Sequence, residues 1–186
     1  MGAGLSALSG VRAFLPVAFL ALYSRLEFAS APVLESTPFD FLEETWVIAL
    51  LFALAIIELA TDKMPALGPT HRAIMRPIKI AMGGLVFAAA MAPDGWIAMT
   101  VCGILGLAIA GLAEHAAFSL RPESQIDTAP FILLSVYADL LVLIGTLLFV
   151  LVPLIGALFA CFMFLFVYRL QQRGKRKHKG LRILKG

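Results

Sequence analysis

A continuous apolar run over residues 131–150 is interrupted by a single carboxylate, Asp139. A membrane-spanning helix needs about 20 apolar residues, so this run has the length of a complete span. A carboxylate near the bilayer midplane costs about 2.5–3.5 kcal/mol on insertion scales, and such a residue usually faces a protein interior or a water-filled cavity. The run therefore predicts a membrane protein that contains a polar site.

The composition of the whole chain agrees with this prediction. Of its 186 residues, 61% are hydrophobic and 15% are charged, whereas soluble domains carry about 25% charged residues. Both cysteines, Cys102 and Cys161, lie in apolar runs without histidines at zinc-ligand spacing, so we expect no disulfide, no metal and no cofactor. The predicted fold class is an all-α, polytopic integral membrane protein, with about six transmembrane helices in one bundle.

Six stretches have the length and apolarity of spanning helices, and residues typical of turns separate them. The predicted spans are residues 8–28, 45–62, 74–92, 96–118, 130–150 and 154–170. The first helix is predicted to be broken or kinked near Arg12, because Gly10 and Pro16 flank it. Residues 1–170 would form a single transmembrane domain.

The distribution of lysine and arginine predicts the orientation, because these residues are enriched in cytoplasmic loops. The tail at 171–186 is strongly basic and the 62–79 connection also carries four basic residues, so both are predicted to be cytoplasmic. The 29–44 loop has no basic residue and is predicted to lie outside, as is the turn at Pro153. With six spans, both termini would be cytoplasmic. The tail adjoins a span, so we expect it to bind anionic lipid and not nucleic acid.

Charged residues in the first three spans form the first part of a candidate site. Arg12 would face an anion or an internal carboxylate, or would instead extend to lipid headgroups. Glu58 and Asp62 are four residues apart and share one helix face; they could share a proton, bind a cation or form a solvated helix end. Arg76 and Lys79 could bind an anionic group or serve as cytoplasmic anchors of the third span.

The fourth and fifth spans supply the remaining candidates. Glu114 follows a stripe of small residues that favours tight helix packing, and the adjacent His115 is of the residue type most often used as a proton acceptor or donor; the alternative is an interfacial pair. A polar stripe in the fifth span consists of Ser135, Asp139 and Thr146. Asp139 could act in transport, or could be a structural partner of Arg12 or Arg76.

Several of these stretches resemble a known family. Gly10–Pro16, Glu58–Pro65 and Arg76-Pro77 resemble hallmark stretches of a bacterial inner-membrane family, catalogued as domain of unknown function 4126. His115, residues 122–124 and residues 139–142 are similar to its later stretches, so the resemblance covers about residues 4–150. The family pattern has an acidic pair where this chain has Ala138-Asp139, so a two-carboxylate mechanism is not implied there. The resemblance implies the layout of the spans and an inner-membrane location, and it implies no activity.

We considered three classes of function. The favoured one is a small transporter or channel with a cytoplasm-facing polar cavity for an ion, a proton or a small anionic solute. The second is an intramembrane enzyme or binder acting on a phosphorylated lipid, with Arg12, Arg76 and Arg121 on the phosphate and His115 or a carboxylate as acid or base. The third is a non-catalytic membrane scaffold. Enzymatic activity is left open and is less favoured, and homo-oligomerisation is left open too.

Overall fold

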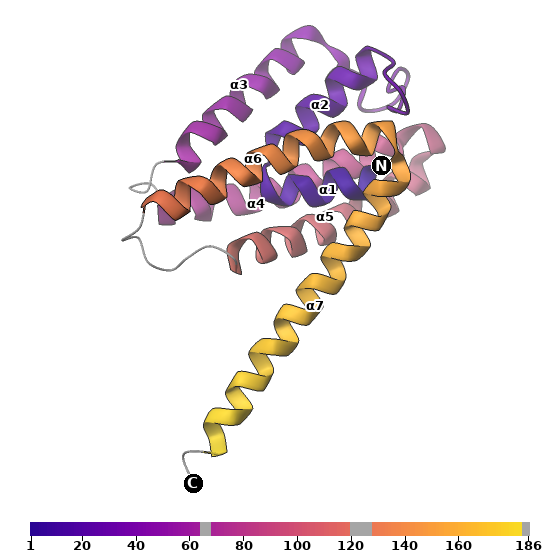
Figure 1. The fold of residues 1–186 in the computed structure, drawn as a ribbon. Helices are drawn as coiled ribbons and strands as arrows, with labels where there is room; N and C mark the ends of the chain where they lie inside the picture. Colours follow the sequence, from indigo (N-terminus) through magenta and orange to yellow (C-terminus); the bar gives the residue numbers. More distant parts are fainter. Residues whose placement is uncertain (64–67, 120–127, 184–186) are drawn as a thin grey trace.

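A computed structural model describes residues 1–63, 68–119 and 128–183, and in this part of the chain the secondary structure is entirely helical (Figure 1). The elements, in chain order, are α1 (Gly2–Val11), α2 (Phe14–Arg25), η1 (Asp40–Glu43), α3 (Thr45–Asp62), α4 (Gly68–Ala90), η3 (Ala92–Asp94), α5 (Trp96–Ser119), α6 (Thr128–Leu151) and α7 (Pro153–Ile183). Four of the predicted spans correspond to α3, α4, α5 and α6. The predicted span at 154–170 corresponds to α7. This helix is longer than predicted, because it continues through most of the basic segment to Ile183.

The first predicted span is two helices separated by a break at Arg12. Arg12 has extended backbone angles (φ −131°, ψ 118°), and α2 begins at Phe14. Pro16 accounts for the position of this break, because in a continuous helix its ring would collide with the carbonyl of Arg12, four residues earlier. In α2, Pro16 lies in the first turn, where no intrahelical hydrogen bond is lost. The single helix expected over 8–28 is therefore replaced by two helices, and the expected break is present.

The two short helices reverse direction at the break. The main-chain nitrogen of Met1 donates a hydrogen bond to the carbonyl of Pro153 (3.2 Å), so α1 starts beside the end of α6. At its other end, Arg12 contacts Asp139, in the middle of α6. α2 then returns, and Arg25 at its end contacts Thr45 at the start of α3. α1 and α2 thus form a helical hairpin with its tip at Arg12, and both arms start or end at the same end of the bundle (Figure 1).

This reversal corrects one expected placement. The orientation predicted from the basic residues puts Met1 and the Pro153 turn on opposite sides of the membrane. The hydrogen bond between them puts both at one end of the bundle. The prediction fails because it assumes that residues 8–28 cross once in one direction, and hydropathy carries no information about a reversal within a short apolar segment.

Small residues let α1 pack closely against α4 and α5. A Cβ added to Gly83 of α4 would lie 2.2 Å from the Cβ of Ala110, and one added to Gly10 would lie 2.3 Å from the carbonyl oxygen of Ala110. The Ser6 hydroxyl donates to the carbonyl of Gly106 at 2.7 Å. Such close backbone approach is the packing expected from the small-residue stripe of the fourth span.

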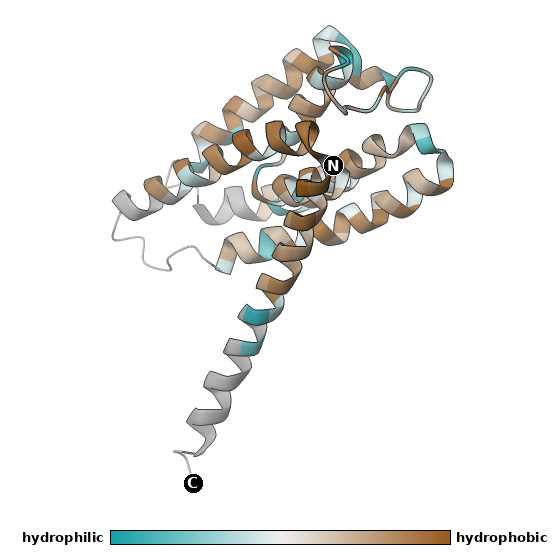
Figure 2. Ribbon diagram, turned by 45° about the vertical axis from the view of Figure 1, so that its right-hand side comes forward, coloured by the Kyte–Doolittle hydropathy of each residue, from teal (hydrophilic) through white to brown (hydrophobic). Residues whose placement is uncertain are grey.

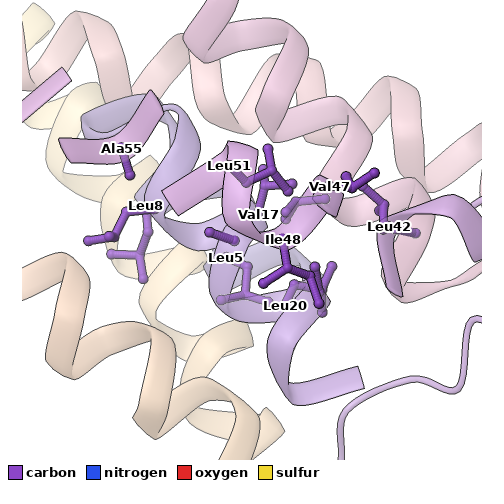
Figure 3. Packing of buried hydrophobic residues seen from close by; sticks show 14 of the residues in the cluster. Leu5, Leu8, Val17, Leu20, Leu42, Val47, Ile48, Leu51 and Ala55 are labelled. Carbon is purple, nitrogen blue, oxygen red and sulfur yellow. The ribbon is translucent and has the colours of Figure 1, made fainter. Parts of the chain in front are cut away.

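A hydrophobic core joins the hairpin to α3. Leu5 and Leu8 of α1 pack with Val17 and Leu20 of α2, and α3 covers them (Figure 3). The α3 residues that Figure 3 labels in this cluster are Val47, Ile48, Leu51 and Ala55. The α2 arm is the part of the hairpin that packs on α3, and Arg12 at the tip lies beside Asp62 at the end of α3.

Three helices are long and apolar enough to cross a membrane: Thr45–Asp62, Ala73–Ala90 and Trp96–Ser119. Shorter apolar helices in the described part of the chain are Gly2–Val11, Phe14–Arg25, Ser135–Leu151 and Pro153–Arg169. Their outward surfaces are apolar: Tyr137 of α6 and Leu158 of α7, for example, are largely exposed. In Figure 2 the hydrophobic colour runs along most of the coloured part of the helices. These features indicate a membrane protein.

Candidate functional site at the tip of the hairpin

Arg12 is the most buried charged residue among those with described side chains, with 1% of its surface exposed. Its Nε donates to Oδ1 of Asp139 at 2.6 Å, and its Nη2 lies 2.5 Å from the same oxygen. Its Nη1 lies 2.8 Å from Oδ2 of Asp62, as an ion-pair contact and not an aligned hydrogen bond. Arg12 thus joins carboxylates from two different helices, α3 and α6.

A hydroxyl group completes this arrangement. Nη2 of Arg12 donates to Oγ of Ser135 at 2.9 Å, and Oγ donates in turn to Oδ2 of Asp62 at 3.1 Å. Lys63 approaches Asp139 from the other side, with Nζ 3.4 Å from Oδ2. We refer to Arg12, Asp62, Lys63, Ser135 and Asp139 as the Arg12 cluster.

Glu58 has a separate task beside the cluster. Its two carboxylate oxygens accept hydrogen bonds from the main-chain N–H groups of Ala13 (2.9 Å) and Phe14 (3.2 Å). These amides have no intrahelical partner, because they stand at the start of α2. A carboxylate at a helix N-terminus is also favoured by the helix dipole. Glu58, which is 3% exposed, therefore stabilises the break itself.

The electrostatics of the site follow from its burial. A buried ion pair is costly to desolvate, and its attraction compensates only when the geometry is good and further hydrogen bonds are made. Arg12 meets both conditions, and of the two alternatives left open by the sequence the structure has the one in which it faces internal carboxylates. Together, Glu58 and the Arg12 cluster contain three carboxylates and two cations, which leaves one formal negative charge in excess.

The other predicted residues lie outside this cluster. Arg76 of α4 forms an ion pair with Glu114 of α5 (3.3 Å), and 61% of the Arg76 side chain is exposed. His115 is exposed and Lys79 is half-buried. The hydroxyl of Thr146 donates to the carbonyl of Leu143 in its own helix. Arg121 lies outside the described residues.

Sequence reasoning missed two components of the site. Lys63 is not among the predicted site residues, although its position at the end of α3 places it against Asp139. The main-chain amides of Ala13 and Phe14 were also missed; Pro16 was the available signal, because a proline in a first helical turn marks a helix start with unpaired N–H groups.

The arrangement joins the break between α1 and α2 to both α3 and α6 through ion pairs. In the described part of the chain, no group of three or more His, Cys, Asp or Glu residues is placed to hold a metal ion. The polar atoms are already paired with one another, so a free ligand would reach Arg12 only if the cluster opened.

Comparison with known proteins gives one match. No curated protein and no solved structure matches the chain. The model of one protein family, described as "Domain of unknown function (DUF4126)", matches residues 1–173. This match includes the hairpin, the Arg12 cluster and the Arg76–Glu114 pair. The chain therefore belongs to the family of domain of unknown function 4126.

Proposed function

We propose that this protein is a transporter of the bacterial inner membrane, in which the Arg12 cluster latches the α1–α2 hairpin and couples its opening to proton binding. The observation that carries this proposal is a fully buried arginine at a helix break, paired with carboxylates on two other helices. Ionisable residues at membrane depth mark ion and substrate paths by default. Broken helices that line the transport site recur in secondary transporters.

The proposed topology has five crossings, α3 to α7, and one hairpin that enters and leaves on the same side. The end of the bundle that contains Met1 and Pro153 would face outward, because the 26–44 loop and the turns near residues 92–95 and 152 contain no lysine or arginine. The end that contains Lys63 and the basic segment of α7 would be cytoplasmic. This proposal replaces a first span by a hairpin and moves Met1 to the outer side.

An epitope tag would test this topology. Attached before Met1 through a flexible linker, it should be removed by protease added to intact spheroplasts, whereas a fluorescent protein fused after residue 186 should stay protected. Protection of both tags would support six crossings and overturn the hairpin topology.

Asp139 is the proposed proton acceptor of the cluster. Its side chain is 19% exposed, against 6% for Asp62, so a proton can reach Asp139 more readily. Protonation would neutralise one of the two carboxylates on Arg12 and weaken the link between the hairpin tip and α6. The remaining pair with Asp62 would keep the tip on α3, so the opening would lie between the hairpin and α6.

The test is proton movement in proteoliposomes that contain a pH-sensitive dye. A panel of inorganic ions, organic anions and organic cations is added outside, and a substrate is recognised by a proton flux absent from protein-free vesicles. We expect Asp139→Asn to abolish that flux and Arg76→Gln, the matched control, to retain it. A flux that is unchanged in Asp139→Asn would contradict the proposal.

A scaffold role is the second candidate, and the mutual pairing within the Arg12 cluster favours it. In a scaffold, the cluster would only specify how the hairpin docks, as buried polar groups do in some proteins. A triple variant, Arg12→Met with Asp62→Leu and Asp139→Leu, separates the two, because it leaves neither carboxylate buried without Arg12. A scaffold would tolerate this apolar replacement in cells that depend on the protein, whereas a proton-coupled transporter would lose activity while remaining folded.

The phosphorylated-lipid enzyme gains no comparable support. The arginines proposed to bind the phosphate do not lie together. Arg12 is buried among carboxylates, and Arg76 pairs with Glu114. A lipid phosphate at either position would meet an existing negative charge.

A further inference from the structure

A cavity of about 260 Å³ lies beside the Arg12 cluster, between α5, α6 and α7. Its walls are apolar, with Ala113, Ala116 and Ala117 of α5 on one side and Phe159, Phe162 and Met163 of α7 on the other. Small-molecule sites commonly measure about 300–1,000 Å³, so this cavity is near the size of a small ligand.

Two neighbouring polar residues touch one end of the otherwise apolar cavity wall. Asp62 and Ser135 both line it, although most of the surrounding side chains are apolar. Arg12 touches both of these residues but does not line the cavity. A ligand at this end would therefore meet a carboxylate and a hydroxyl group in a region with an excess of negative charge.

The cavity also borders the surface that faces lipid. Tyr137 of α6 and Phe162 of α7 both line it, and they are 78% and 61% exposed. α7 leaves the bundle obliquely past this point (Figure 1). A molecule dissolved in the bilayer could thus enter sideways between α6 and α7.

From these observations we infer that the cavity binds a single-chain amphiphile with a cationic head, such as a protonated alkylamine. The chain would lie along the alanines of α5 and the aromatic residues of α7, and the ammonium group would face Asp62 and Ser135. An alkyl carboxylate would place a second negative charge beside Asp62, which is unfavourable in a region of low dielectric constant. This inference concerns binding, so it does not depend on the proposed transport activity.

The experiment compares three ligands with the same chain and different heads: decylamine, decanol and decanoate. Binding to the purified protein in neutral detergent is measured by native mass spectrometry at a pH at which the amine is protonated. We expect decylamine to bind at least about tenfold more tightly than decanoate, with decanol between them. Equal binding of all three would show a purely apolar site and overturn the inference.

A pair of variants tests the location. Ala117→Leu fills the cavity from α5 and should abolish decylamine binding, whereas Ala108→Leu changes an exposed alanine of the same helix and should leave it intact. Ala138→Leu fills the cavity from α6 and provides a second probe if Ala117→Leu does not fold. Tight binding to a folded filling variant would place the site elsewhere. Decylamine binding without any decylamine-driven proton flux would separate this site from the transport proposal.

Discussion

In the described part of the chain, two arginines, Arg12 and Arg76, link helices through carboxylates, and the two links differ in burial and in the number of contacts. Arg12 is 1% exposed and contacts two carboxylates and a hydroxyl group, on α3 and α6. Arg76 is 61% exposed and contacts one carboxylate, Glu114, at 3.3 Å. An exposed pair contributes about 0–1 kcal/mol, whereas breaking a buried pair costs about 3–5 kcal/mol. Two arginines near the ends of predicted spans can thus differ in their contribution to stability, and the difference follows from how deeply each side chain is buried.

The largest expected effect is the loss of Arg12. Arg12→Met leaves Asp62 and Asp139 close together without their shared cation, so the free energy of unfolding should fall by about 3–5 kcal/mol. Arg76→Met, the matched control, should lower it by no more than about 1 kcal/mol. Denaturant unfolding in mild detergent micelles measures both. Equal losses would remove the distinction between the two links.

The next effect tests whether packing, as well as charge, positions the hairpin tip. Gly10→Ala places a methyl group 2.3 Å from the carbonyl of Ala110, and we expect a loss of about 1–3 kcal/mol from this overpacking. At Gly111 the nearest atom would be 3.8 Å away. Gly111→Ala should therefore be neutral, or more stable by up to about 1 kcal/mol through helix propensity. If thermal unfolding shows the two variants to be equally stable, charge alone positions the tip.

A smaller effect is expected at the start of α2. Glu58→Gln removes the negative charge that faces the N–H groups of Ala13 and Phe14, and we expect a loss of about 1 kcal/mol, as for other helix caps. Glu35→Gln changes an exposed carboxylate in the 26–44 loop and should have no measurable effect in the same assay. If Glu58→Gln leaves the stability unchanged, the helix break does not need a carboxylate at this position.

The smallest effect is expected at Lys63, on the exposed side of the Arg12 cluster. Its side chain is 42% exposed and lies 3.4 Å from Asp139. Lys63→Gln should therefore change stability by less than about 1 kcal/mol, and added salt should reduce the difference between the variant and the parent protein. A loss as large as that of Arg12→Met would show that the whole cluster behaves as one buried unit.

The sequence was sufficient for most helices and for the carboxylates, the arginine and the serine of the site, but not for Lys63, for the main-chain amides or for the arrangement of these groups. α3 and α5 lie where apolar length and turn residues predict them, because both signals are local. The direction of α2 was not predictable, since Pro16 marks a break but not the angle after it. The choice of partner for Arg12 was also open, because Asp139 is 127 positions away in the chain and only the packing of the hairpin against α3 and α6 brings them together.

Hydrogen exchange at the hairpin tip tests the central claim, that the Arg12 cluster latches the hairpin, most directly. Mass spectrometry would compare exchange of the segment 8–20 in the parent protein and in Asp139→Asn, with residues 83–90 of α4 as an internal reference. We predict exchange at least about tenfold faster at the tip in the variant, equivalent to about 1.4 kcal/mol, and no change in α4. Unchanged exchange at the tip, or an equal increase in both segments, would contradict the latch.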